Sequence, residues 1–217
     1  MPTTEIALIP LIPGTPIGDP SHSSAAALKD IMTTLHEQPG LQQVHFGTQV
    51  ENPDMLQMMI DWDSRQRHEN FMASPAYKPF LDTFGTIMSG SPQLSHVDLQ
   101  PSASEAAKAI SAPVTEVATF YFDGEPNADW LDNAAKAREW LVKEAGESLG
   151  AAFGITHEVV EYKGVKGKAA VLVAGWSSKE AHVEFRGTET FKENIPLLRG
   201  DSKAIEMHHV VLMHAVR

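Results

Sequence analysis

The chain contains one motif twice, and this repeat constrains the fold more than any other feature of the sequence. The pattern Trp-x5-His-x2-Phe begins at Trp62 and again at Trp176. The flanks match at nearly the same offset, with Thr4-Glu5-Ile6-Ala7 recurring as Thr115-Glu116-Val117-Ala118 and His96-Val97-Asp98-Leu99 as His209-Val210-Val211-Leu212. A repeat of roughly 110 residues is too long for a solenoid unit and suits a small domain. The sequence therefore predicts two similar units and a fused pseudo-dimer.

The first copy alternates strand and helix patterns. An apolar run of strand length opens it at 5–12. A helix with one buried face is predicted next, because apolar residues recur at i, i+3, i+4 and i+7: Leu28, Ile31, Met32 and Leu35. Two strands, a helical segment carrying His68, a Ser74-Pro75 helix start and a strand over 94–100 follow. This β-α-β-β-α-β order is the ferredoxin-like pattern.

The second copy repeats this order with a longer central hairpin. We expect a first strand over 116–122, a helix over 128–144, hairpin strands over 154–162 and 168–176, a helical segment over 178–198 and a last strand over 204–216. The domain prediction is a first unit at 1–101, a linker at 102–113 that is helical over 104–110, and a second unit at 114–217. Because the hairpins differ in length, the two sites should not be identical.

Composition narrows the classes of partner. The net charge is −11 and no basic run stands out, which argues against nucleic acid and anionic membranes. The absence of cysteine excludes disulfides, thiolate nucleophiles and iron–sulfur ligation. The N-terminus has no signal-peptide pattern, and no apolar stretch approaches the ~20 residues that span a bilayer. We therefore expect a cytoplasmic protein.

Two ferredoxin-like units, each with a third strand ending in Trp and a Trp-x5-His-x2-Phe helix, resemble the dimeric α+β barrel superfamily, closest to its antibiotic biosynthesis monooxygenase (ABM) branch. The Ser-Pro helix start at Ser74 supports this resemblance. It implies an α+β fold in which the two tandem units form a pseudo-dimeric α/β barrel. One difference stands out. Where many ABM proteins have a histidine three residues before the serine of the Ser-Pro pair, this chain has Phe71, and His68 lies one turn earlier.

The resemblance also implies a small-molecule pocket in each unit, between helices and sheet. The leading expectation is an ABM-like tailoring protein of secondary metabolism, a monooxygenase that acts without a cofactor on an aromatic or polyketide-type metabolite. Two alternatives remain open. One is a polyketide cyclase or dehydratase of the same fold, and the other is a non-catalytic small-molecule-binding or stress-response protein.

The repeated motif supplies the candidate site residues. His68 and His182 are the candidate bases, because an imidazole titrates near neutral pH and can take a phenolic or enolic proton. Each lies i, i+3 from a phenylalanine, so the pair shares a helix face. We expect the His68 imidazole to be about half exposed. The candidate substrate-binding residues are Trp62, Phe71, Tyr77, Trp176 and Phe185.

The remaining predictions concern metals, partners and assembly. Adjacent His208 and His209 on a strand point to opposite faces, so the sequence predicts no metal site, and we expect no cofactor. The expected partner is a small aromatic or polyketide-like molecule. A barrel closed within one chain does not require dimerisation, so we expect a monomer or a weak homodimer, which light scattering can check. Tyr77 and Phe191 occupy matched positions of the repeat, and only the first unit has a tyrosine hydroxyl near its histidine, so we expect the first unit to hold the working pocket.

Overall fold

A computed structural model describes residues 2–216, which form two compact units. The first unit comprises residues 2–94 together with the C-terminal residues from Met213 onward, and the second comprises residues 95–212. Each unit follows the β-α-β-β-α-β order along the chain. The predicted class, α+β with two ferredoxin-like units, is therefore confirmed.

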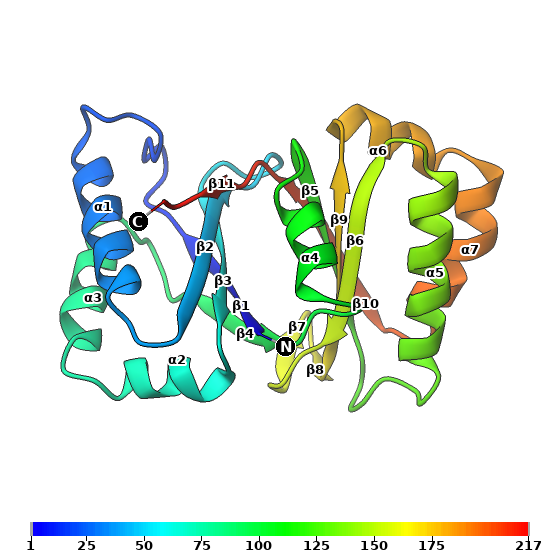
Figure 1. The fold of residues 1–217 in the computed structure, drawn as a ribbon, viewed down its shortest axis with the longest axis horizontal. Coiled ribbons are helices and arrows are strands. Elements are labelled where there is room, and N and C mark those ends of the chain that lie inside the picture. The colour runs from blue at the N-terminus through cyan, green and yellow to red at the C-terminus, as the bar shows by residue number, and fades with distance from the viewer. Residues whose placement is uncertain (1, 217) are drawn as a thin grey trace. The chain divides into compact units, whose positions relative to one another are not determined.

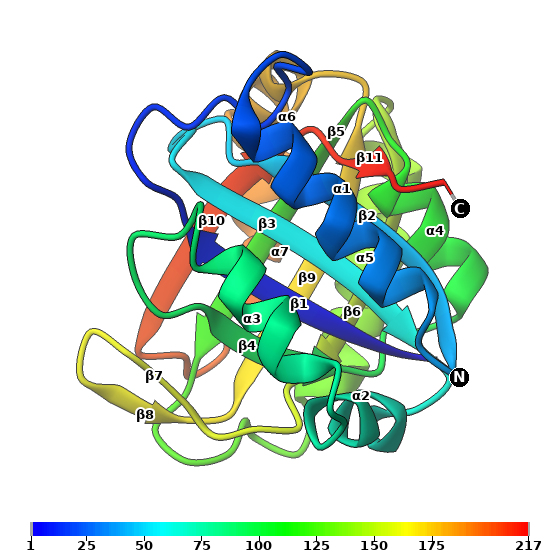
Figure 2. The ribbon, with the colours of Figure 1, turned by 90° about the vertical axis from the view of Figure 1, so that its left-hand side faces the viewer.

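The first unit is one sheet with helices packed on a single face. Its elements are β1 (Thr3–Pro10), α1 (Ser23–His36), β2 (Leu41–Thr48), β3 (Met55–Trp62), α2 (Arg65–Met72), α3 (Tyr77–Phe84) and β4 (Gln93–Val97), the last of which leads into the second unit. The strand order is β11-β2-β3-β1-β4, with β11 at Met213–His214. Figure 2 shows α1 and α3 lying side by side over this sheet.

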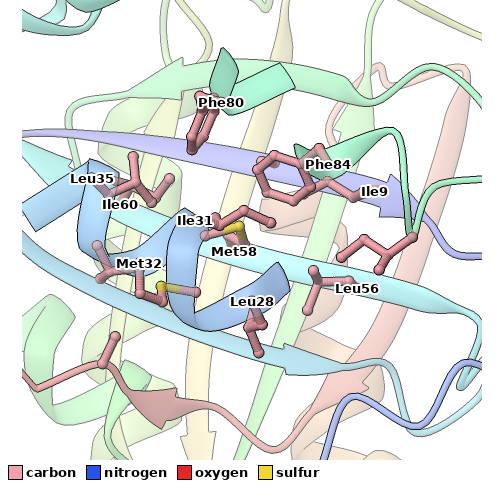
Figure 3. Close-up of a cluster of buried hydrophobic side chains, with 14 of the residues drawn as sticks. Ile9, Leu28, Ile31, Met32, Leu35, Leu56, Met58, Ile60, Phe80 and Phe84 are labelled. Atoms are coloured by element: carbon pink, nitrogen blue, oxygen red, sulfur yellow. The ribbon is translucent and has the colours of Figure 1, made fainter. Parts of the chain in front are cut away.

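The predicted helical stripe does form the core of the first unit. Leu28, Ile31, Met32 and Leu35 are all buried on α1. They pack against the alternate residues of β3, among them Met58 and Ile60, as Figure 3 shows. Period-2 alternation in the strand and period-3.6 spacing in the helix thus direct apolar side chains into one layer.

The second unit has a four-stranded sheet and an added helix. Its elements are α4 (Ala103–Ile110), β5 (Val114–Tyr121), α5 (Trp130–Glu144), β6 (Ser148–Ile155), β7 (Val160–Tyr162), β8 (Val165–Gly167), β9 (Ala169–Trp176), α6 (Lys179–Arg186), α7 (Glu189–Arg199) and β10 (Ala204–Val210). The strand order is β10-β5-β9-β6. In Figure 1, α5 and α7 cover one face of this sheet and α4 covers the other.

The segment predicted as a linker is a packed helix of the second unit. Thr115 Oγ1 donates to the carbonyl of Ala109 at 3.0 Å and fixes the end of α4 to β5. Gly175 on β9 allows the close approach, because a Cβ added there would lie 2.9 Å from the Cα of Ala109. A larger residue at this position would therefore push α4 away from the sheet.

Two strand predictions were wrong in extent. The central hairpin does not run on to Tyr162. The residues by which this hairpin is longer than its counterpart in the first unit form a separate hairpin, β7–β8, whose turn has positive φ at Lys163 and Gly164. The last strand stops at Val210, and Met213–His214 pairs instead with Phe46 and His45 of β2 in the first unit. None of the helices within residues 2–216 is long and apolar enough to cross a membrane.

Candidate functional site

A buried carboxylate joins a tryptophan and a histidine in the first unit. Trp62 Nε1 donates to Glu5 Oε2 at 2.9 Å, and His68 Nδ1 lies 3.4 Å from the same oxygen. The indole and imidazole stack, with ring centroids 5.3 Å apart and planes 15° from parallel. All three side chains are buried. We call Glu5, Trp62 and His68 the first carboxylate cluster.

The second unit contains the matching arrangement of glutamate, tryptophan and histidine. Trp176 Nε1 donates to Glu116 Oε2 at 3.0 Å, and His182 Nε2 lies 3.3 Å from that oxygen. Trp176 stacks on His182, with ring centroids 4.7 Å apart and planes 20° from parallel. In addition, His182 Nδ1 lies 2.7 Å from His209 Nε2. We call Glu116, Trp176, His182 and His209 the second carboxylate cluster.

Strand alternation and helix spacing explain why these side chains meet. On β1, Glu5 points to the same face as Ala7 and Ile9, which belong to the core under the helices. Antiparallel pairing places Thr3 opposite Trp62, so the indole lies diagonal to Glu5 on that face. The helix that follows β3 then carries His68 back over the end of the sheet.

Sequence reasoning missed the two carboxylates and His209 as site residues. The available signal was a glutamate inside an otherwise apolar strand, repeated in the matched Thr-Glu-x-Ala flanks at Glu5 and Glu116. The histidine of the matched β10 flank was the signal for His209, which pairs across the strands with Glu116. A buried carboxylate needs hydrogen-bonding partners, and the repeated Trp and His supply them.

The His68 imidazole is more deeply buried than the sequence analysis expected. The exposed fractions of His68 and His182 are 3% and 1%, so the expectation that His68 is half exposed was wrong. The cause is the tryptophan, since each indole covers one face of its imidazole. Each histidine is thus part of the helix–sheet layer as well as a candidate base.

One arrangement of protons satisfies the second carboxylate cluster. His182 Nε2–H donates to Glu116, and His182 Nδ1 then accepts from His209 Nε2–H. Burial raises the pKa of the Glu116 carboxyl to about 7, although the hydrogen bond from Trp176 and the charge of Arg186 oppose this rise. A carboxyl group with this pKa exchanges a proton readily near neutral pH.

We expect Glu116→Gln to change how stability depends on pH. The folded-state pKa is about 7 against 4.5 for the ordinary carboxyl, so the folded chain holds a proton that the unfolded chain has lost. The contribution of Glu116 to the free energy of unfolding therefore falls as pH rises from about 4.5 through about 7, by about 3 kcal/mol in total. Glutamine cannot ionise and removes this slope. Urea denaturation of both proteins across this range tests it, and parallel stability curves would contradict it.

The first carboxylate cluster borders a narrow apolar cavity. It is lined by Glu5, His68, Phe71 and Tyr77, among others. Trp62 is not among the described residues that line it. Burial raises the pKa of the Tyr77 phenol, as does the nearby charge of Glu5. The cavity volume is about 30 Å³, enough for one or two water molecules.

The second carboxylate cluster borders a larger cavity of about 80 Å³. Glu116, Trp176 and His182 line it, together with Phe191, whereas Phe185 packs behind against Trp176, with ring centroids 5.6 Å apart. A polycyclic ligand needs more room than this, so it must displace side chains at the mouth. The larger volume lies in the second unit, which differs from the expectation that the first unit holds the working pocket.

Comparison with known proteins identifies the domain type. Residues 22–83 match the family model described as antibiotic biosynthesis monooxygenase. This match covers α1, β2, β3, α2 and most of α3 of the first unit. The resemblance to the ABM family seen in the sequence is confirmed by this match in the first unit. No curated protein sequence matches the chain.

Solved structures show that the tandem arrangement recurs. An anthrone oxidase-like protein has a TM-score of 0.72 at 14% identity, covering 98% of this chain and 92% of its own. A protein described as a candidate monooxygenase of Fusobacterium nucleatum has a TM-score of 0.61 at 14% identity, covering 97% and 92%. A second protein with the same description, from Lactobacillus acidophilus, has a TM-score of 0.60 at 11% identity, and the match covers 99% of this chain and 95% of its own. The chain therefore has an ABM-like fold of two units along its whole length.

Proposed function

We propose that this protein is an ABM-like tailoring enzyme that takes a proton from a phenol or enol in the second cavity. The substrate is an aromatic or polyketide-type metabolite, and the anion then reacts with dioxygen without a bound cofactor. One observation carries the proposal: Glu116 and His182 contact each other at the wall of a largely apolar cavity. A base placed beside an apolar cavity is the arrangement that such a proton transfer requires.

The second carboxylate cluster supports proton transfer better than an isolated histidine would. Glu116 holds the Nε2–H of His182, and His209 faces the other ring nitrogen. A proton taken from the substrate can be shared among three buried groups, which spreads the positive charge that the base acquires. The pKa of Glu116 at about 7 places this exchange close to neutral pH.

An anthrone is a suitable test substrate, because a solved structure of similar fold is named as anthrone oxidase-like. In the enol form of the anthrone the hydroxyl gives its proton to the base, and the anion that remains is electron-rich at the carbon opposite the oxygen. Dioxygen takes the electron pair, a carbon–oxygen bond forms, and protonation gives a hydroperoxide. Loss of water then yields the quinone, so that one anthrone and one dioxygen give one anthraquinone and one water.

Simultaneous measurement of oxygen uptake and quinone absorbance tests this proposal. We expect equal amounts of oxygen consumed and quinone formed, at a rate proportional to protein concentration and above the uncatalysed rate. Conversion of a poly-β-ketone without oxygen uptake would favour the cyclase alternative, since the same base could form an enolate for ring closure. Binding without any turnover would favour the non-catalytic alternative.

A further inference from the structure

The mouth of the second cavity carries two arginines that the first cavity lacks. Arg186 and Arg199 are exposed residues that line the second cavity. Aligning the repeats on Trp62 and Trp176 puts Met72 and Gly85 at the matching positions. Within residues 2–216 the first cavity has no lysine or arginine in its lining. The two cavities thus share the carboxylate clusters but differ in charge at the mouth.

The fold of a unit does not require an arginine at either of these positions. Arg186 ends α6 and Arg199 ends α7, where a cation favourably meets the negative end of the helix dipole. The matching helices of the first unit, α2 and α3, have no basic residue in their last turns. The same fold therefore forms without a cation at either position.

Among the described residues neither arginine is held in an ion pair, although the charge of Arg186 acts on Glu116 from a distance. Lys192 on helix α7, by contrast, pairs with Glu189. The chain as a whole has a net charge of −11, so its general field repels anions. The two arginines beside this cavity therefore form a locally positive site on a negatively charged protein. Arginine suits this place, because its planar guanidinium binds a carboxylate through two parallel hydrogen bonds.

We propose that the second cavity binds an aromatic ligand bearing a carboxylate, with the rings in the cavity and the carboxylate held by Arg186 and Arg199. This inference rests on the proposed function, because it names the substrate class of the same site. The ring system lies against Glu116 and His182, and the anionic group stays at the exposed arginines. The first cavity takes no such ligand.

Two fluorescent probes of the same ring system test the charge requirement. Anthracene-9-carboxylate carries the anionic group, and 9-anthracenemethanol is its neutral counterpart. We would titrate both into the wild-type protein and into the double variant Arg186→Gln, Arg199→Gln. The matched control is Lys143→Gln, Lys192→Gln, which removes the same charge from exposed positions of α5 and α7 away from the cavity lining.

We expect the arginine variant to bind the carboxylate about tenfold or more weakly, as loss of charge-assisted hydrogen bonds predicts. Its affinity for the alcohol should stay within about twofold, and the lysine control should match the wild type for both probes. Equal weakening of both probes, equal weakening by the lysine control, or no binding of either probe would overturn the inference. The fluorescence titration measures binding and does not depend on catalytic turnover. Selective carboxylate binding without oxygen uptake would therefore overturn the proposed function alone.

Discussion

Replacing Glu116 with glutamine is expected to lower the rate of oxygen-dependent anthrone conversion by roughly 10²–10⁴-fold, the usual contribution of general acid–base catalysis. Glutamine keeps the shape of the side chain and can still accept from Trp176, so the packing of the second carboxylate cluster should persist. It cannot take a proton, and it no longer balances charge on His182. Quinone formation by the purified variant, with circular dichroism to check the fold, measures the effect.

Two further variants sharpen this test. Glu184→Gln removes the same charge from an exposed position of α6 and should leave the rate unchanged. Glu5→Gln makes the equivalent change in the first carboxylate cluster and reports whether the narrower first cavity contributes to turnover. A wild-type rate for Glu116→Gln would contradict the role of the second cluster. A loss seen only with Glu5→Gln would move the reaction to the first unit.

Trp176→Ala is expected to destabilise the protein by about 3–5 kcal/mol, the usual cost of removing a buried aromatic side chain. Trp176 is fully buried, and its indole donates to Glu116 while covering one face of His182. The substitution therefore leaves a cavity and also removes a donor from a buried carboxylate. Urea denaturation of the variant measures the loss, and activity should fall with it because His182 loses its support.

Trp140→Ala is the matched control for the effect of size. Trp140 is only partly buried and lies at the lining of the second cavity, so its truncation should cost far less stability than that of Trp176. Trp62→Ala should repeat the large loss, because Trp62 has the same role beside Glu5 in the first unit. Equal costs for Trp140 and Trp176 would show that burial and the bond to the carboxylate do not govern the stability of this layer.

His182→Ala separates structural from chemical roles. The imidazole is smaller than an indole, so its loss should destabilise the protein less than Trp176→Ala does, even though both side chains are buried. Activity should fall as far as with Glu116→Gln, because both side chains belong to one proton-sharing cluster. If His182→Ala unfolds the protein as readily as Trp176→Ala, the histidine is primarily a packing residue of this layer.

The sequence by itself determined the two-unit organisation and the order of elements. Strand alternation and helical spacing depend on local side-chain periodicity, so Leu28, Ile31 and Leu35 identified a buried helix face without any tertiary information. The repeated Trp, His and Phe positions likewise identified the layer in which both clusters lie. These patterns are properties of neighbouring residues, and they survive in the folded chain.

Only the tertiary structure decided how the site is assembled. Glu116 becomes a candidate acid–base group because folding buries it against Trp176 and His182, which are about 60 residues away along the chain. The same packing buried His68, which we had expected from the sequence to be half exposed. The pairing of Met213–His214 with β2 likewise joins residues far apart in sequence. Burial, desolvation and long-range pairing depend on the whole fold, whereas periodicity is already present in a short segment.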